Sequence, residues 1–236
     1  MSTEAPPKQQ LPEGVKITLH WLNQSRAQRI LWLLEDLNVP YEVKVYHRSK
    51  LTMLAPAELK HVHPLGKSPL LTIEAPNLDK PLVLAESAAI VEYLVDHFGK
   101  GTNIEPNRWR EGLEGKVGDM QTSGPFLIKP VTHLITSKIH SLYLDPNLNT
   151  HFSFMESQLE SAPDCGGYLC GNKLNAADIM NVYCLDFATY DRVGAPLTRE
   201  KYPKLYEYTK KCMEGEGAKR AVRKIIEVEG SYDAKL

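Results

Sequence analysis

The order of hydrophobic periods in the first third of the chain constrains its fold more than any other feature. Apolar side chains recur at every second position from Val15 to Trp21, which predicts a β-strand. From Ile30 to Leu37 the period is that of a helix, and Pro40 ends it. Alternation returns over residues 41–46. A strand, a helix and a strand within about thirty residues form a βαβ unit, so the two strands should be parallel with a right-handed crossover.

The same layer continues to residue 98. A short helix is predicted around residues 57–62, followed by strands at 70–73 and 82–84 and a helix that opens at Ser87. Strand patterns then vanish: residues 99–106 (GKGTNIEP) have the composition of a linker, and the remainder is helical in pattern to about residue 228, with roughly six helices. The predicted fold class is therefore α/β plus all-α. It comprises a flexible tail at 1–14, an α/β domain at 15–98, the linker at 99–106 and a helical domain at 107–236.

Charge and composition exclude several classes of function. The chain has 28 basic and 29 acidic residues, a net charge of −1, and a charged fraction of 24%, which is typical of soluble globular proteins. This balance gives no general attraction to nucleic acid or to anionic membranes. The basic residues of the segment 210–224 are interleaved with glutamates, which favours a solvated helix face over a nucleic-acid or membrane module.

No targeting, membrane or metal signal is visible. The first residues lack both the basic opening and the apolar core of a signal peptide, and the longest conspicuous apolar run, 30–34, is far shorter than the ~20 residues of a membrane helix. Four cysteines at uneven spacings form no metal-binding or disulfide pattern, so we expect reduced thiols and no metal. These features predict a cytoplasmic protein.

Three short segments carry residues suited to chemistry. In HPLGKSP (63–69), a cis Ser68–Pro69 bond would leave the backbone of Ser68 free to pair with an extended peptide; a plain trans turn is the alternative. In LAES (84–87), Ser87 can cap a helix and donate its hydroxyl to a carboxylate, while Glu86 accepts an ammonium; simple capping is the alternative. In NQSR (23–26), a hydroxyl at a helix start can stabilise an anion such as a thiolate, or only cap the helix.

Together and in this order, these segments resemble the glutathione transferases. HPLGKSPLL resembles the family's cis-proline segment and LAESAAIVEYL its Glu-Ser motif. GNKLNAADI (171–179) resembles the capping motif of the C-terminal domain, with Asn175 as the N-cap and Asp178 reaching back to it. HWLNQSRAQRILWLLEDLNVPYE looks most like a fungal branch. The resemblance implies a thioredoxin-like N-terminal domain followed by an all-helical domain, assembled as a homodimer.

The resemblance also implies a set of glutathione-binding residues. The catalytic serine of serine-type members stands four residues before a basic residue of the first helix, and counting back from Arg29 gives Ser25, with Asn23 as the competing candidate. The loop holds no tyrosine or cysteine, which speaks against the tyrosine-type and cysteine-type classes. Ser68 stands where valine is more usual, but its role would be through the backbone. The expected glutathione contacts are Lys67, Ser68, Glu86 and Ser87, with Arg48 or Lys50 as a further basic contact.

The implied chemistry is activation of the glutathione thiol as a co-substrate, without a prosthetic group. Lowering a thiol pKa by about 2 from its usual value near 8.5 requires about 2.7 kcal/mol, which one hydroxyl and a helix end nearly supply. The expected activity is conjugation of glutathione to apolar electrophiles, or reduction of peroxides with it. A non-catalytic ligand carrier or regulator is the alternative. Met120, Phe126 and Tyr183 are candidates for the electrophile cleft, with core packing as the alternative for each.

Overall fold

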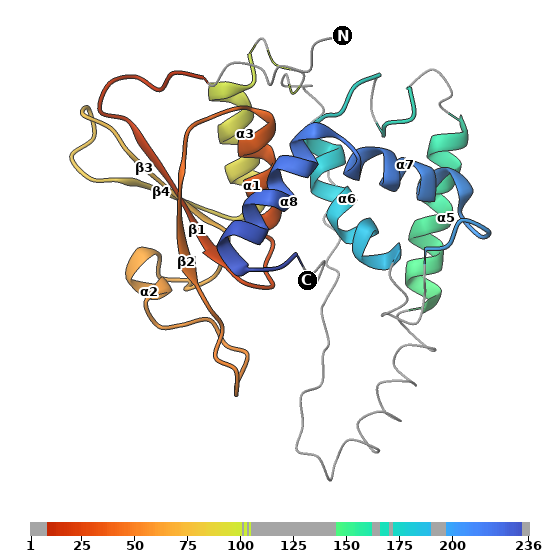
Figure 1. Cartoon of the computed structure of the whole chain (residues 1–236), viewed down its shortest axis with the longest axis horizontal. Helices are drawn as coiled ribbons and strands as arrows, with labels where there is room; N and C mark the ends of the chain where they lie inside the picture. The colour runs from red at the N-terminus through yellow and green to blue at the C-terminus, as the bar shows by residue number, and fades with distance from the viewer. Residues whose placement is uncertain are drawn as a thin grey trace.

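The computed structural model describes residues 9–100, 102, 104, 145–161, 166–169, 172–189 and 197–232. A sheet with its flanking helices lies on one side of the molecule and a group of helices on the other (Figure 1). Met120 and Phe126, proposed for an electrophile cleft, lie outside the described residues, as does part of the expected linker. The arrangement follows the predicted order of an α/β layer before a helical region.

The sheet has four strands in the spatial order β2-β1-β3-β4. The strands are β1 (Lys16–Leu22), β2 (Glu42–Tyr46), β3 (Leu70–Glu74) and β4 (Leu82–Ala85). β1 pairs parallel with β2, which confirms the predicted βαβ unit. β3 pairs antiparallel with both β1 and β4. β3 therefore lies inside the sheet, and the segment that precedes it reaches the end of β1 where the chain turns into the first helix.

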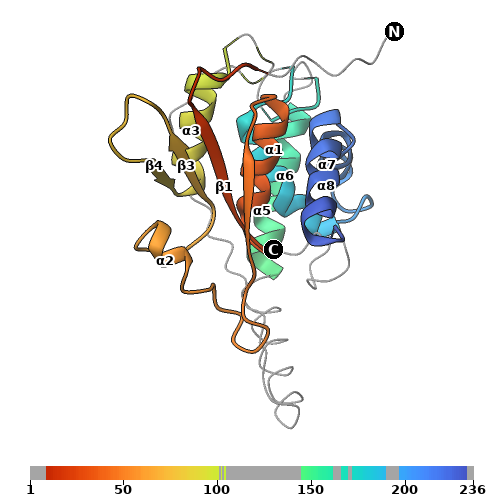
Figure 2. The same cartoon turned by 60° about the vertical axis from the view of Figure 1, so that its left-hand side comes forward.

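Helices cover both faces of this sheet, although only the face of β1 that carries Ile17, Leu19 and Trp21 is apolar throughout. Ile17 and Leu19 are buried in the main core with α1 (Ala27–Asp36) and α3 (Ser87–Phe98). Leu22 belongs to a second, smaller core under α2 (Leu59–Val62), on the other face (Figure 2). His20 is buried between the hydroxyls of Tyr46 and Thr72, at 3.0 and 2.8 Å. Burial, reinforced by the charge of Lys44, lowers the pKa of His20 to about 4, so it is neutral at physiological pH.

The described helical region contains α5 (Asp145–Ser161), α6 (Ala176–Thr189), α7 (Pro203–Met213) and α8 (Glu216–Glu229). The sequence predicted helix to about residue 228, and α8 ends one residue later. α5 holds the start of α7 through Glu156, whose carboxylate accepts the backbone N–H groups of Lys204 and Leu205 at 2.8 and 2.7 Å. Within the described ranges no helix is long and apolar enough to cross a membrane.

α8 leaves the helical region and packs along α1 of the sheet region (Figures 1 and 2). Arg220 of α8 donates to the backbone oxygen of Glu35 at 2.7 Å and lies 3.7 Å from the Asp36 carboxylate. A Cβ atom added to Gly217 would lie 1.4 Å from Oδ1 of Asp36, so only glycine permits this approach. Burial raises the pKa of Asp36 to about 6, against the opposing effects of Trp32 and Arg220. A buried polar contact therefore joins the two regions.

Candidate functional site

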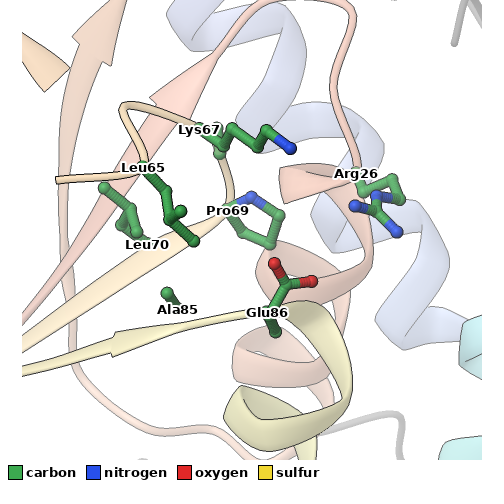
Figure 3. Close-up of a pocket in the computed structure, with 8 residues that line it drawn as sticks. Arg26, Leu65, Lys67, Pro69, Leu70, Ala85 and Glu86 are labelled. Carbon is green, nitrogen blue, oxygen red and sulfur yellow. The ribbon is translucent and has the colours of Figure 1, made fainter. Parts of the chain in front are cut away.

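A pocket lies where three segments of the sheet region meet: the start of α1, the turn before β3 and the junction of β4 with α3. Figure 3 shows its polar side chains reaching toward a common space from these different segments. The lining residues are Arg26, Leu65, Lys67, Ser68, Pro69, Leu70, Ala85 and Glu86. Of the glutathione contacts expected from the sequence, the structure brings Lys67, Ser68 and Glu86 to this pocket. It has two basic side chains and one carboxylate.

The turn before β3 presents backbone groups to this pocket. The Ser68–Pro69 peptide bond is cis, the conformation that the family resemblance implied. No backbone–backbone hydrogen bond joins Ser68 to another residue that the structure describes. Its side chain points back into the fold, where Oγ donates to the backbone oxygen of His20 at 3.2 Å. The side chain of Ser68 is thus fixed to β1, while its backbone has no partner in the sheet.

The start of α3 agrees with the prediction in position but not in capping. The helix opens at Ser87 as predicted, but the N-cap is Glu86, so Ser87 does not have the capping role that the sequence also allowed. Glu86 has φ 70°, a left-handed conformation that non-glycine residues rarely adopt, and no side chain caps the helix. Ser87 is 3% exposed, and its hydroxyl has no hydrogen-bond partner. A buried hydroxyl without a partner costs about 1–3 kcal/mol, so this helix start holds one unsatisfied buried group, with the exposed Glu86 beside it.

Ser25 lies beneath the pocket, not in its lining. It is buried, its Oγ donates to the backbone oxygen of Leu22 at 2.7 Å, and it accepts the N–H of Ala27 at 3.2 Å. It also lies 3.3 Å from Oγ of Ser68. The following residue, Arg26, is exposed and reaches the pocket. The sequence reasoning missed Arg26, because an exposed arginine at a helix start carries no signal of its own.

Arg48 and Asn23 hold the neighbouring loops together. Oδ1 of Asn23 accepts the backbone N–H of Arg48 at 2.7 Å. The Arg48 side chain donates to the backbone oxygens of Asn23, Gln24 and Met53 at 3.1–3.4 Å. Neither residue lines the pocket, and exposed Lys50 does not line it either. The structure therefore gives Arg48 a positioning role in the loop that precedes α1.

The capping motif of the helical region forms as the sequence predicted. Oδ1 of Asn175 accepts the N–H of Ala177 at 2.8 Å, and Oδ2 of Asp178 accepts the N–H of Asn175 at 2.8 Å. Asp178 is fully buried and also accepts the N–H of Leu169 and the hydroxyl of Tyr208, at 3.0 and 2.9 Å. Burial raises the pKa of Asp178 even though these hydrogen bonds oppose the shift. This motif holds α6 in place and takes no part in the pocket.

Two further expectations concern the helical region and metals. Tyr183, the described candidate for an electrophile cleft, is 3% exposed within α6, a burial that agrees with core packing. The groups of His, Cys, Asp and Glu within the described ranges contain no cluster able to hold a metal ion.

Comparisons with known proteins identify the family. Residues 25–97 match the model of the glutathione S-transferase N-terminal domain, and residues 125–216 match that of the C-terminal domain. Glutathione S-transferase 1 of Saccharomyces cerevisiae is 32% identical over 216 residues, covering 82% of this chain and 88% of the relative.

Two solved structures share the architecture. A glutathione S-transferase from Actinobacillus pleuropneumoniae superimposes with a TM-score of 0.60 at 26% identity, over 88% of this chain and 92% of that one. A glutathione transferase from Phanerochaete chrysosporium, solved with oxidised glutathione, gives a TM-score of 0.60 at 18% identity over 92% and 98% of the two chains. The predicted thioredoxin-like N-terminal domain and helical C-terminal domain are confirmed, and the chain belongs to the glutathione S-transferase family.

Proposed function

We propose that this protein binds glutathione in the pocket between α1, β3 and α3 and transfers its thiolate to apolar electrophiles. The observation that carries the proposal is the start of α3, where a buried Ser87 hydroxyl without a partner stands beside Glu86. A helix start of this kind binds a carboxylate, and the adjacent Glu86 carboxylate accepts an ammonium. An amino-acid head group supplies both, and glutathione presents one at its γ-glutamyl end.

The remaining polar groups fit the rest of the tripeptide. The unpaired backbone of Ser68 pairs with the cysteinyl residue as an added strand would. Lys67, on the same turn, binds the glycyl carboxylate. The pocket's two cations and one anion complement a ligand with two carboxylates, one ammonium and an ionisable thiol. The Phanerochaete chrysosporium relative, which was solved with oxidised glutathione, supports this class of ligand.

The proposed reaction needs the thiolate and no general base from the protein. The family resemblance assigns stabilisation of the sulfur anion to the start of α1, with Ser25 as the first candidate and Asn23 as the secondary one. The sulfur attacks the electrophilic carbon, a C–S bond forms, and the electron pair of the broken bond leaves with the departing group or stays on the substrate as a carbanion that takes a proton from water. In the reduction of a peroxide, the same thiolate attacks one oxygen of the O–O bond, so that glutathione sulfenic acid forms and the other oxygen leaves as an alcohol. The thiol of a second glutathione then attacks the sulfenic sulfur, which gives glutathione disulfide and water.

The serine-type fungal branch, the domain limits and the assembly belong to the same proposal. We place the glutathione-binding domain at 15–98, the linker at 99–106 and the helical domain at 107–236, in a cytoplasmic homodimer. In that dimer, the sheet region of one subunit packs on the helical region of the other. Light scattering at micromolar concentration that gives the 26.6 kDa of one chain contradicts the dimer.

A binding experiment paired with a turnover experiment tests the function. The full chain is passed over immobilised glutathione, and conjugation of 1-chloro-2,4-dinitrobenzene and reduction of cumene hydroperoxide are followed with the eluted protein. Retention with conjugation supports the proposal. Retention without either reaction indicates the alternative, a ligand carrier or regulator of the same fold. A wild-type chain that is not retained, and does not bind free glutathione in solution, contradicts the proposed site itself.

A further inference from the structure

The hydroxyl of Ser25 already donates a hydrogen bond within the protein. A serine hydroxyl has one proton, and that of Ser25 is donated to the backbone oxygen of Leu22 at 2.7 Å. Both residues are buried, so a bond from Ser25 to a sulfur atom has to replace an existing buried one. The net gain is smaller than that of a free hydroxyl, and the start of α1 needs another source of positive potential to hold a thiolate.

Arg26 has the position and the freedom to supply it. It directly follows Ser25, stands at the N-cap of α1, and lines the pocket. Its side chain is exposed, and it forms no hydrogen bond or ion pair with any residue that the structure describes. In Figure 3 it extends from the start of α1 toward the space above Glu86, on the side of the pocket away from Leu65. A guanidinium keeps its charge at every physiological pH.

Matching the ligand's charges to the pocket leaves one pair unassigned. The proposed binding mode uses Glu86 for the ammonium, the start of α3 for the glutamyl carboxylate and Lys67 for the glycyl carboxylate. The cation still without a partner is Arg26, and the ligand group still without one is the sulfur. The two are brought together because the cysteinyl residue pairs with Ser68, whose Oγ lies 3.3 Å from Oγ of Ser25, the neighbour of Arg26.

We propose that the Arg26 guanidinium, and not chiefly the Ser25 hydroxyl, holds the glutathione sulfur as a thiolate. This inference rests on the proposed function. Glu86 is the one carboxylate in the lining of the pocket, and the ligand's ammonium neutralises it on binding. The charge of Arg26 is thereby left for the sulfur. Ser25 remains as the residue that shapes the entry into α1, through Leu22 on one side and Ala27 on the other.

The test compares Arg26→Gln, Arg26→Lys and Ser25→Ala in the full chain, with Lys80→Gln as the control for loss of one exposed charge outside the pocket. The pKa of the bound thiol is read from the ultraviolet absorbance of the thiolate as the pH is raised. Loss of a charge-assisted hydrogen bond predicts a rise of about 1 to 2 in that pKa for Arg26→Gln, and a fall in kcat/KM at neutral pH of about 10- to 100-fold that recovers at high pH. Arg26→Lys retains most of the activity, and Lys80→Gln changes neither quantity.

Binding of S-methylglutathione separates the sulfur from the carboxylates. Since this analogue has no ionisable thiol, its affinity should be the same for wild type and Arg26→Gln. An equal loss of affinity for glutathione and for the analogue shows that Arg26 binds a carboxylate, and overturns the inference. A rise in the thiol pKa with Ser25→Ala but not with Arg26→Gln, or with Lys80→Gln as strongly as with Arg26→Gln, also overturns it. Failure of the proposed function is recognised separately, because wild type itself then binds neither ligand.

Discussion

The starts of α3 and α6 are built from similar residues but are completed in opposite ways. At α6, the side chains of Asn175 and Asp178 bond the first backbone N–H groups reciprocally, and Asp178 is fully buried. At α3, Glu86 holds a left-handed backbone, no side chain caps the helix, and the buried hydroxyl of Ser87 has no partner. A helix start whose backbone N–H groups are hydrogen-bonded by its own side chains stabilises the fold. A helix start that keeps an unsatisfied buried hydroxyl can take the missing partner from a ligand, as we propose for α3.

The start of α8 is a third case, packed against the other region of the molecule without a side-chain cap. Its first turn lies against the Asp36 carboxyl group at the end of α1, with Gly217 leaving room for the approach. Arg220 of the next turn lies 3.7 Å from the same group. Here the helix start is neither capped by its own residues nor lined by the pocket, but packed against a titratable side chain. The three starts can therefore be distinguished by stability, by affinity and by pH.

The largest effect is expected from Asp178→Ala at the α6 start. The substitution removes the acceptor of three hydrogen bonds, from the N–H groups of Leu169 and Asn175 and the hydroxyl of Tyr208. The last two of these donors are buried and the first is half-buried. We expect the free energy of unfolding to fall by about 3–5 kcal/mol, measured by urea denaturation. Asp96→Ala, at an exposed aspartate of α3, is the control and should change it by less than about 0.5 kcal/mol. A loss below 1 kcal/mol for Asp178→Ala would show that water replaces these bonds.

Asp36→Asn tests the titratable contact at the α8 start. The folded pKa of Asp36, about 6, lies above its unfolded value of about 3.9, so folding favours the protonated form. That contribution to stability is complete below pH 4 and is lost as the pH rises through 6. Relative to wild type, Asp36→Asn should therefore gain about 2–3 kcal/mol of unfolding free energy between pH 4 and pH 7. If the unfolding free energies of wild type and Asp36→Asn change in parallel over this pH range, the raised pKa of Asp36 is contradicted.

Ser87→Ala tests the unsatisfied start of α3. The affinity for glutathione should fall about 10- to 100-fold, because a hydrogen bond to a carboxylate contributes about 1.5–3 kcal/mol. Stability in the absence of ligand should rise by about 1–3 kcal/mol, since the substitution removes a buried hydroxyl that has no partner. Calorimetric titration and urea denaturation measure the two quantities, with Ser153→Ala on the exposed face of α5 as the control. A loss of stability with unchanged affinity would reverse the contrast with α6.

The smallest effect is expected from Asn175→Ala. It removes one neutral cap, and the backbone N–H of residue 175 still donates to Asp178, so the unfolding free energy should fall by about 1 kcal/mol. Glutathione affinity should not change. Asn175→Asp, which keeps an acceptor oxygen, should recover most of the loss. If both variants lose affinity as well as stability, the two helix starts are coupled and cannot be treated separately.

Local features of this molecule were predictable from the sequence. The strands and helices of the first 98 residues follow from hydrophobic periods, which contiguous residues set. The capping of α6 follows from the spacing of Asn175 and Asp178 for a similar reason, since both bonds close within one helical turn. Residue types alone did not determine whether the Ser68–Pro69 bond is cis or trans. The resemblance to a family predicted the cis form, which the structure has.

What the sequence did not predict depends on contacts between distant segments. The position of Arg26 in the pocket requires the turn before β3, about forty residues later, to return beside it. Ser87 was assigned to the cap because serine is a common N-cap, whereas the left-handed backbone of Glu86 is imposed by its surroundings. The close approach of Gly217 to Asp36 also gives no signal in the neighbouring sequence. A glycine within a helix by itself indicates only a lower helix propensity.

The return of α8 onto α1 has a consequence for synthesis of the chain. α1 is translated early, yet the helix that covers part of it is added only after the entire helical region. At about 5–20 residues per second, the roughly 180 residues between Asp36 and Glu216 take about 10–40 s to add. For that time the nascent sheet region carries a helix face that has no permanent neighbour. The sheet region therefore cannot be completed on the ribosome before the last helix has emerged. During that interval, the uncovered face of α1 is the surface that a holding chaperone would protect.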